Sequence, residues 1–474
     1  MIQPSKRLEI VEEYYFSKKL KEVNLLKAHG KPIINFGIGS PDLEPQFSVL
    51  SALANSLGDE KAHAYQSYQG LPELRQAMAA FYKEKFGVSL SWQVEILPLM
   101  GSKEGIMHIS MAFLNEGDEV LIPNPGYPTY ASVAKLLNVR PRYYDLWEKS
   151  NWEPNLSALE KTKNLSKVKL MWVNYPHMPT GAKASNKTFD DLIAFAKRNN
   201  ILVVNDNPYS LILNDFPRSI LKYSGAKEVC LELNSLSKTF NMAGWRVGMV
   251  LGKAEYLEAI LKVKSNMDSG MFYGIQKGAI DALKSTQSWY SSLDETYSER
   301  RKLAWKLADA LECTYSKNAA GMFVWAKLPD GTSSEAFTDK LLKEHSIFVA
   351  PGTVFGSRGE GYIRISLCAS KEDYGEAIKR IDKTNQPMKD LTSSQIQFLQ
   401  QYGIGIHQIL DAQGMTLSEM QIRMKKEGKF IAYNVKACKQ GGHTLRTKTG
   451  HCAQCYTERI GLKELKLTKS KKVR

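Results

Sequence analysis

Apolar strands alternate with amphipathic helices through the middle of this chain. The apolar runs at residues 119–123, 168–174 and 201–205 are each long enough for one buried strand. A helical pattern at 187–199 separates the last two runs, as a crossover between parallel strands requires. This order predicts an α/β protein with a largely parallel sheet.

The length of 474 residues allows two or three domains. We expect the N-terminal segment to join a helix–strand–strand–helix layer in a small domain, around a separate large domain. The expected divisions are 1–44 and 285–384 for the small domain, 45–284 for the large domain and 385–474 for a basic C-terminal module. A helix is expected over 6–28, and a long helix that leaves the large domain is expected to begin at Glu255.

Charge and hydropathy indicate a soluble cytoplasmic protein. The N-terminal residues lack the apolar core of a signal peptide, and no apolar run approaches the ~18 residues that span a bilayer. The net charge of +15 is uneven, because from residue 385 onward 16 lysines and arginines accompany 6 acidic residues. The six cysteines do not form the pattern of a secreted disulfide framework.

The stretch from Asn234 to Gly252 gathers groups that could bind a phosphorylated aldehyde. It reads NSLSKTFNMAGWRVGMVLG and contains Ser235, Ser237, Lys238 and Arg246. An amine forms a Schiff base with an aldehyde, and a guanidinium binds phosphate strongly. A solvated loop could contain the same residue types, so other segments must support this interpretation.

Two other segments supply complementary groups. Gly101 and Ser102 open a predicted helix, and backbone N–H groups at a helix start bind anions. Asp206 ends an apolar strand three residues before Tyr209. A buried carboxylate at that point would keep a pyridine nitrogen protonated, although a turn or cap role is the simpler alternative.

The pattern S-x-S-K-x5-G-x-R-x-G resembles the lysine signature of the class I/II aminotransferases, fold type I enzymes that use pyridoxal phosphate. Matching motifs extend the resemblance over roughly residues 1–385. It implies a large domain with a mostly parallel seven-stranded sheet, a smaller α+β domain and a homodimer. It also implies amino-group transfer between an L-amino acid and a 2-oxo acid through a Schiff base on Lys238.

The resemblance assigns a role to each matching residue. Lys238 is the catalytic lysine, Asp206 pairs with the pyridine nitrogen, Tyr209 donates to the phenolic oxygen and Tyr127 stacks on the ring. The expected phosphate ligands are Gly101, Ser102, Lys103, Ser235, Ser237 and Arg246, with Tyr65 reaching into the partner subunit's phosphate site. Gly39 and Arg364 are expected to bind the substrate, Arg364 through its α-carboxylate.

One position departs from the family pattern. In the turn that runs from Asn174 to Gly181, Met178 occupies the place of an asparagine that donates to the phenolic oxygen. A thioether cannot donate a hydrogen bond. We therefore expect a more basic phenolic oxygen, unless Asn174, also expected at the cofactor, or His177 compensates.

The C-terminal residues contain a possible zinc site. Cys438, His443, Cys452 and Cys455 are suitable tetrahedral ligands, with His451 an alternative for the fourth position. We expect structural zinc in a small module with helices over 393–402 and 417–427. The basic end could contact nucleic acid, but without interleaved aromatic residues a solvated tail is favoured.

Several substrates and functions stay open. Segments such as D-N-P-Y-S and S-K-T-F-N-M-A-G-W-R-V-G look most like LL-diaminopimelate aminotransferases, yet aspartate or aromatic amino acids are alternatives. A carbon–sulfur lyase or a decarboxylase could use the same scaffold. A non-enzymatic regulator that senses pyridoxal phosphate and binds nucleic acid through the tail is a further alternative.

Overall fold

The computed structural model describes residues 2–385, 432–433 and 445–446. The chain divides into two compact units, Met1–Ile378 and Lys379–Arg474. In the second unit, the described residues are 379–385 and the two strands of a short antiparallel pair, β14 (Ala432–Tyr433) and β15 (Leu445–Arg446). Among the described residues, no helix is long and apolar enough to cross a bilayer.

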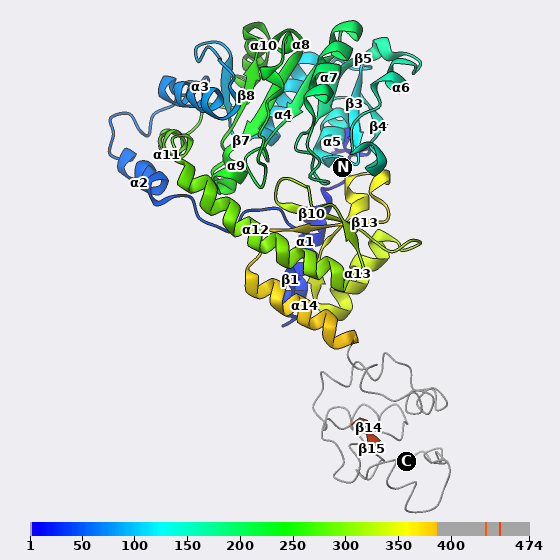
Figure 1. Cartoon of the computed structure of the whole chain (residues 1–474). Coiled ribbons are helices and arrows are strands. Elements are labelled where there is room, and N and C mark those ends of the chain that lie inside the picture. The colour runs from blue at the N-terminus through cyan, green and yellow to red at the C-terminus, as the bar shows by residue number, and fades with distance from the viewer. Residues whose placement is uncertain (1, 386–431, 434–444, 447–474) are drawn as a thin grey trace, which may run out of the picture. The chain divides into compact units, whose positions relative to one another are not determined.

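A seven-stranded sheet forms the centre of the large domain (Figure 1). Its strands, in spatial order, are β2 (Ile96–Leu99), β8 (Gly248–Gly252), β7 (Cys230–Ser235), β6 (Leu202–Asp206), β5 (Val168–Val173), β3 (Glu119–Asn124) and β4 (Arg140–Asp145). Only β8 runs antiparallel to its neighbours, so the predicted α/β fold with a mostly parallel sheet is confirmed.

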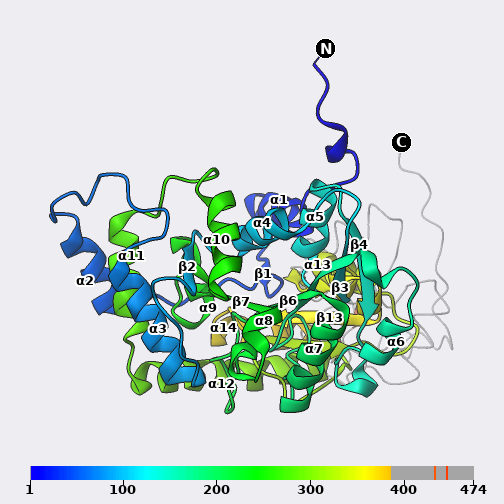
Figure 2. The same cartoon turned by 90° about the horizontal axis from the view of Figure 1, so that it is seen from above.

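Helices cover both faces of this sheet (Figure 2). The helices α4 (Ser102–Phe113), α5 (Pro128–Leu136) and α10 (Ala254–Lys264) lie on one face, and α7 (Asn186–Asn199) and α8 (Ala226–Val229) lie on the other. Apolar side chains of the first group and of the sheet form a continuous core, including Ile106, Ile109 and Ile260. The remaining helices of the large domain are α2 (Phe47–Ser56), α3 (Pro72–Phe86), α6 (Leu156–Glu160), α9 (Leu236–Thr239) and α11 (Tyr273–Leu283).

Local sequence signals explain where several helices begin and end. Ser185 accepts a hydrogen bond from the Thr188 amide and so caps α7, which ends at Asn200 in the left-handed conformation. Helix α3 begins with Pro72, whose missing N–H needs no partner at this position, and ends at Gly87, which has a φ of +66°. Such caps satisfy the free backbone groups at helix ends.

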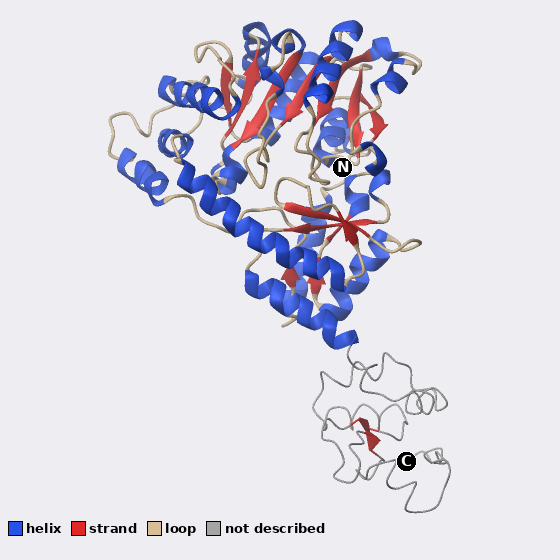
Figure 3. Ribbon diagram, in the orientation of Figure 1, coloured by secondary structure: helices blue, strands red, loops and turns tan. Residues whose placement is uncertain are grey.

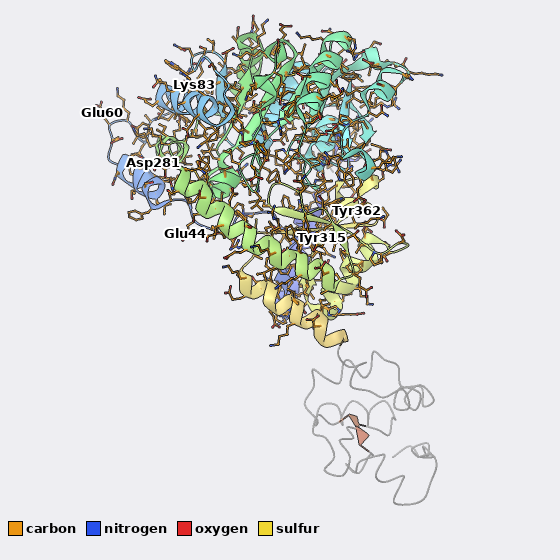
Figure 4. The ribbon with its side chains drawn as sticks, viewed as in Figure 1. Glu44, Glu60, Lys83, Asp281, Tyr315 and Tyr362 are labelled. Carbon is orange, nitrogen blue, oxygen red and sulfur yellow. The ribbon has the colours of Figure 1, made fainter. Side chains whose placement is uncertain are left out.

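The small domain combines a four-stranded antiparallel sheet with flanking helices (Figure 3). The sheet has the order β12 (Ala350–Pro351), β13 (Tyr362–Ser366), β10 (Phe323–Lys327) and β9 (Thr314–Tyr315), while β1 (Ile34–Asn35) pairs in parallel with β11 (Ile347–Phe348). The helices are α1 (Tyr15–Ala28), α12 (Gln287–Ala310), α13 (Ser334–His345) and α14 (Lys371–Asn385). On β13, Tyr362 stacks on Trp325 with ring centroids 5.0 Å apart. Figure 4 labels Tyr362 in the small domain.

Two predicted helices differ from the structure. Helix α1 begins at Tyr15, and residues Lys6–Leu8 form a separate 3-10 turn, because Leu8 and Ile10 are 53 % and 54 % exposed and bury no helical stripe. The long helix of the small domain is α12, with 24 residues, whereas the helix at Glu255 is the 11-residue α10 that packs beside α4. The predicted domain boundaries stay predictions.

Replacing Trp172 with alanine should destabilise the large domain strongly. The Trp172 ring is buried and stacks on Tyr130 with centroids 4.8 Å apart. We expect its loss to lower the free energy of unfolding by about 3–5 kcal/mol, through lost burial and an internal cavity. Urea denaturation measures this change. Trp147→Ala is the matched control, because Trp147 is 42 % exposed and should cost about 1 kcal/mol or less; equal losses in both variants would contradict the prediction.

Candidate active site

A cavity of about 630 Å³ lies at the carboxyl ends of β5, β6 and β7. Parallel strands end at one edge of their sheet, so side chains that follow them in sequence meet there. The predicted site residues in the cavity wall are Gly39, Ser102, Lys103, Tyr127, Asn174, Asp206, Tyr209, Ser235, Ser237, Lys238, Arg246 and Arg364. Of the other two, Gly101 lies directly behind Arg246, and Tyr65 is 90 % exposed on the surface.

The carboxylate of Asp206 is buried at the end of β6. Tyr130 donates a hydrogen bond of 2.7 Å to its Oδ2, while Oδ1 has no partner among the described residues. Burial raises the pKa of Asp206 to about 7, although the Tyr130 hydrogen bond opposes this shift. Asp206 therefore retains an unused acceptor that a cationic group in the cavity can occupy.

The amine of Lys238 projects into the same cavity from α9. Its Nζ donates a 2.5 Å hydrogen bond to the carbonyl of Gly39. Burial lowers the pKa of Lys238 to about 8, and the positive charges of Arg364 and Arg246 act in the same direction. A substantial neutral fraction near neutral pH is what an amine needs to act as a nucleophile or as a base.

Hydrogen-bond donors gather at one end of the cavity. Ser235 caps α9, its Oγ accepting from the Ser237 amide at 3.0 Å and donating to the Ser237 hydroxyl at 2.8 Å. Gly101 has a φ of +93°, and a Cβ there would lie 2.2 Å from Nη2 of Arg246, so only glycine fits. The start of α4 and the Arg246 guanidinium thus approach each other closely and form an anion site.

A second buried cation occupies the small-domain wall. The Arg364 guanidinium lies over the ring of Phe323 at 4.0 Å and over Phe355 at 4.7 Å. Its Nη2 donates to the Gly37 carbonyl at 2.8 Å, and no carboxylate pairs with it among the described residues. Burial lowers the pKa of Arg364, yet guanidinium groups stay charged in proteins. A carboxylate that enters the cavity could therefore form an ion pair with the Arg364 guanidinium.

The sequence reasoning missed the aromatic part of the wall. Tyr14, Phe16, Phe323 and Phe355 line the cavity together with Arg364. Phe16 comes from α1, and its ring centre lies 5.4 Å from the Arg364 guanidinium. The cluster Tyr14-Tyr15-Phe16 was a visible signal, but its placement depends on the fold and not on a local motif.

Asn174 lines the cavity and also bridges two of its neighbours. Its side-chain amide donates to the carbonyl of Asp206, and its side-chain oxygen accepts from the amide of Met178 at 2.7 Å. These bonds use both polar ends of the side chain to fix the turn after β5 to the end of β6. These contacts help to position Asp206, and the role of Asn174 at the cofactor stays a prediction.

The predicted zinc ligands Cys438, His443, Cys452 and Cys455, the alternative His451, and the helices 393–402 and 417–427 lie outside the described residues. Zinc binding therefore stays a prediction.

The family profile "Aminotransferase class I and II" matches residues 31–381. The chain belongs to the class I and II aminotransferases. An LL-diaminopimelate aminotransferase of Dehalococcoides mccartyi is 41 % identical over 80 % of this chain and 97 % of its own length. The structure of BacF from Bacillus subtilis superposes with a TM-score of 0.77 at 34 % identity, covering 82 % of this chain and 99 % of BacF. An aromatic aminotransferase from Pyrococcus horikoshii has a TM-score of 0.73 at 30 % identity, covering 81 % and 98 %.

This aminotransferase depends on pyridoxal phosphate, the cofactor of its family. The cavity fits that group. Asp206 offers an unpartnered buried oxygen for the pyridine nitrogen, and the glycine-lined anion site beside Arg246 suits a phosphate. Lys238 offers an amine in the same cavity wall.

The stability of the cofactor-free aminotransferase should reveal the lowered pKa of Lys238. The folded state releases this proton near pH 8, whereas the unfolded chain holds it to its ordinary pKa of 10.5. The unfolded state therefore binds more protons between these values, so stability rises with pH in this window. Relative to Lys238→Met, the wild type should gain about 1–3 kcal/mol between pH 8 and 10.5, measured by denaturant unfolding. A constant difference would contradict the lowered pKa.

Proposed function

We propose that Lys238 is the catalytic lysine of this aminotransferase and carries the pyridoxal phosphate in its resting state. The observation that supports this most is the amine of Lys238 in the wall that also contains Asp206, Arg246 and Arg364. When bound, the cofactor withdraws electrons from the Cα of an amino acid and makes its proton acidic. Lys238 Nζ then takes this proton and returns it during amino-group transfer to a 2-oxo acid.

The other residues hold the reacting groups in place. Asp206 keeps the pyridine nitrogen protonated, Tyr127 packs on the ring face and Tyr209 donates to the phenolic oxygen. Gly101, Ser102, Ser235, Ser237 and Arg246 bind the phosphate. Arg364 binds the α-carboxylate of the substrate beside Gly39, so that the Cα faces Lys238.

The proposed substrate is an amino acid with a second carboxylate, of the LL-diaminopimelate type. Relatives at about 40 % identity are LL-diaminopimelate aminotransferases. In addition, Lys103 lies in the cavity wall with its Nζ 4.5 Å from the centre of the Tyr14 ring. An ammonium group there can bind a distal carboxylate as well as the phosphate, which favours a dicarboxylic amino acid over an apolar one.

We further propose a homodimer in which Tyr65 completes the partner subunit's site. Tyr65 is 90 % exposed and lies outside the cavity wall of its own chain. Exposed apolar side chains near it in sequence, including Phe47 and Tyr68, would be buried in such an interface. A cytoplasmic location and a zinc-binding C-terminal module remain proposals that rest on the sequence alone.

An amino-acid panel tests the substrate proposal. Each amino acid is added to the holoenzyme without a 2-oxo acid, and loss of the visible absorbance band reports the half-reaction. We expect LL-diaminopimelate to react with a kcat/KM at least about 10-fold above that of alanine, because it gains the second carboxylate contact. Lys103→Met should reduce this preference several-fold, measured as the ratio of the two kcat/KM values, because a weaker hold on the phosphate would lower both reactions alike. An unchanged preference in Lys103→Met would exclude Lys103 as the second carboxylate site.

A further inference from the structure

The proposed anchoring of the cofactor limits which side chains can reach its phenolic oxygen. That oxygen is bonded to the ring carbon next to the aldehyde-bearing carbon, on the side opposite the phosphate arm. The resemblance assigns Tyr209 and position 178 to this oxygen, and both residues line the same cavity as Asp206, Lys238 and Arg246. The inference below rests on the proposed function through this placement.

Asn174 is held at both ends of its side chain, so it is not free to turn toward the cofactor. Its side-chain amide donates to the backbone carbonyl of Asp206, and its oxygen accepts from the Met178 amide at 2.7 Å. Both partners are buried, so breaking either bond would leave an unsatisfied polar group. His177 cannot replace it, because it is buried outside the cavity wall, with Nδ1 2.8 Å from the Thr180 hydroxyl.

Met178 also offers no donor to the cavity. Its sulfur accepts a hydrogen bond from Nη1 of Arg364 at 3.4 Å, and a thioether has no hydrogen to donate. The side chain is buried, and its backbone amide is committed to Asn174. Met178 is therefore held through its side chain by Arg364 and through its backbone by Asn174.

Tyr209 is the remaining candidate for a side-chain donor to the phenolic oxygen. It lines the cavity at the edge of the Phe323 ring, with centroids 5.7 Å apart. Among the described residues its hydroxyl has no hydrogen-bond partner, so it is free to donate into the cavity.

We propose that Met178 leaves Tyr209 as the single side-chain donor to the phenolic oxygen and thereby makes that oxygen more basic. A more basic oxygen holds the proton that it shares with the Schiff-base nitrogen more tightly. The holoenzyme should then keep this proton to a higher pH than a variant with a second donor. Apart from Tyr209 itself, the ionisable groups around this position are unchanged in every variant proposed below: Asp206, Lys238, Arg364, Tyr127, Tyr14 and Cys368.

A spectrophotometric pH titration of the holoenzyme tests the proposal. The visible band changes when the Schiff-base nitrogen loses its proton, so the midpoint reports the basicity directly and needs no turnover. Met178→Asn introduces a side chain that can donate to the phenolic oxygen and still accept from Arg364. We expect its midpoint to fall by about one pH unit, the size of one added hydrogen bond.

Met178→Leu is the matched control. Leucine has nearly the same volume and, like methionine, no donor, so its midpoint should stay close to that of the wild type. An equal fall in Met178→Leu would assign the effect to packing and overturn the proposal. An unchanged midpoint in Met178→Asn would overturn it as well.

A second measurement keeps the result decisive if the asparagine side chain turns away from the cofactor. Tyr209→Phe should raise the midpoint more in the wild-type background than in Met178→Asn, because only the wild type loses its last donor. Equal effects in both backgrounds would exclude Tyr209 as the single donor. A holoenzyme without any titrating visible band would contradict the proposed function itself, whereas equal midpoints with a normal band would contradict only the role of Met178.

Discussion

Two opposite charges are buried in this cavity without a charged partner, and the rest of the site is arranged around them. Asp206 and Arg364 are 6 % and 5 % exposed, and among the described residues neither forms an ion pair. Burying an unpaired charge is unfavourable, so the favourable packing of the surrounding core must offset this desolvation free energy. A bound ligand with a cationic nitrogen and a carboxylate would give Asp206 and Arg364 each an oppositely charged partner. The cavity is thus preorganised for a cofactor and an amino acid together.

The sheet makes this arrangement possible. Asp206 and Ser235 end neighbouring parallel strands, and Asn174 directly follows a third, so the three meet at one edge. Arg364 comes instead from the small-domain sheet, where Phe323 and Phe355 pack against its guanidinium. The substrate would therefore bind between the two domains. Flat aromatic rings can hold the arginine in place without neutralising it.

The sequence predicted the polar residues of the cavity better than its aromatic lining. Lys238, Asp206 and Arg364 belong to local motifs, because each lies within a strand or shortly after one. The aromatic wall could not be predicted, since Phe16 meets Arg364 only through contacts distant in sequence. The start of α1 was misplaced because an apolar pattern cannot show whether anything packs on it. The hydrogen bonds of Asn174 could not be predicted for a similar reason, as they depend on where Met178 and Asp206 lie.

The central claim is that Lys238, and no other lysine of the cavity, carries the cofactor. Borohydride reduction of the holoenzyme converts a Schiff base to a stable amine, and digestion with mass spectrometry then locates the modified lysine. The account predicts a phosphopyridoxyl group on the peptide that contains Lys238 and none on the peptide that contains Lys103, the other lysine in the cavity wall. Modification of Lys103, or of neither lysine in a protein that retains the visible band, would contradict it.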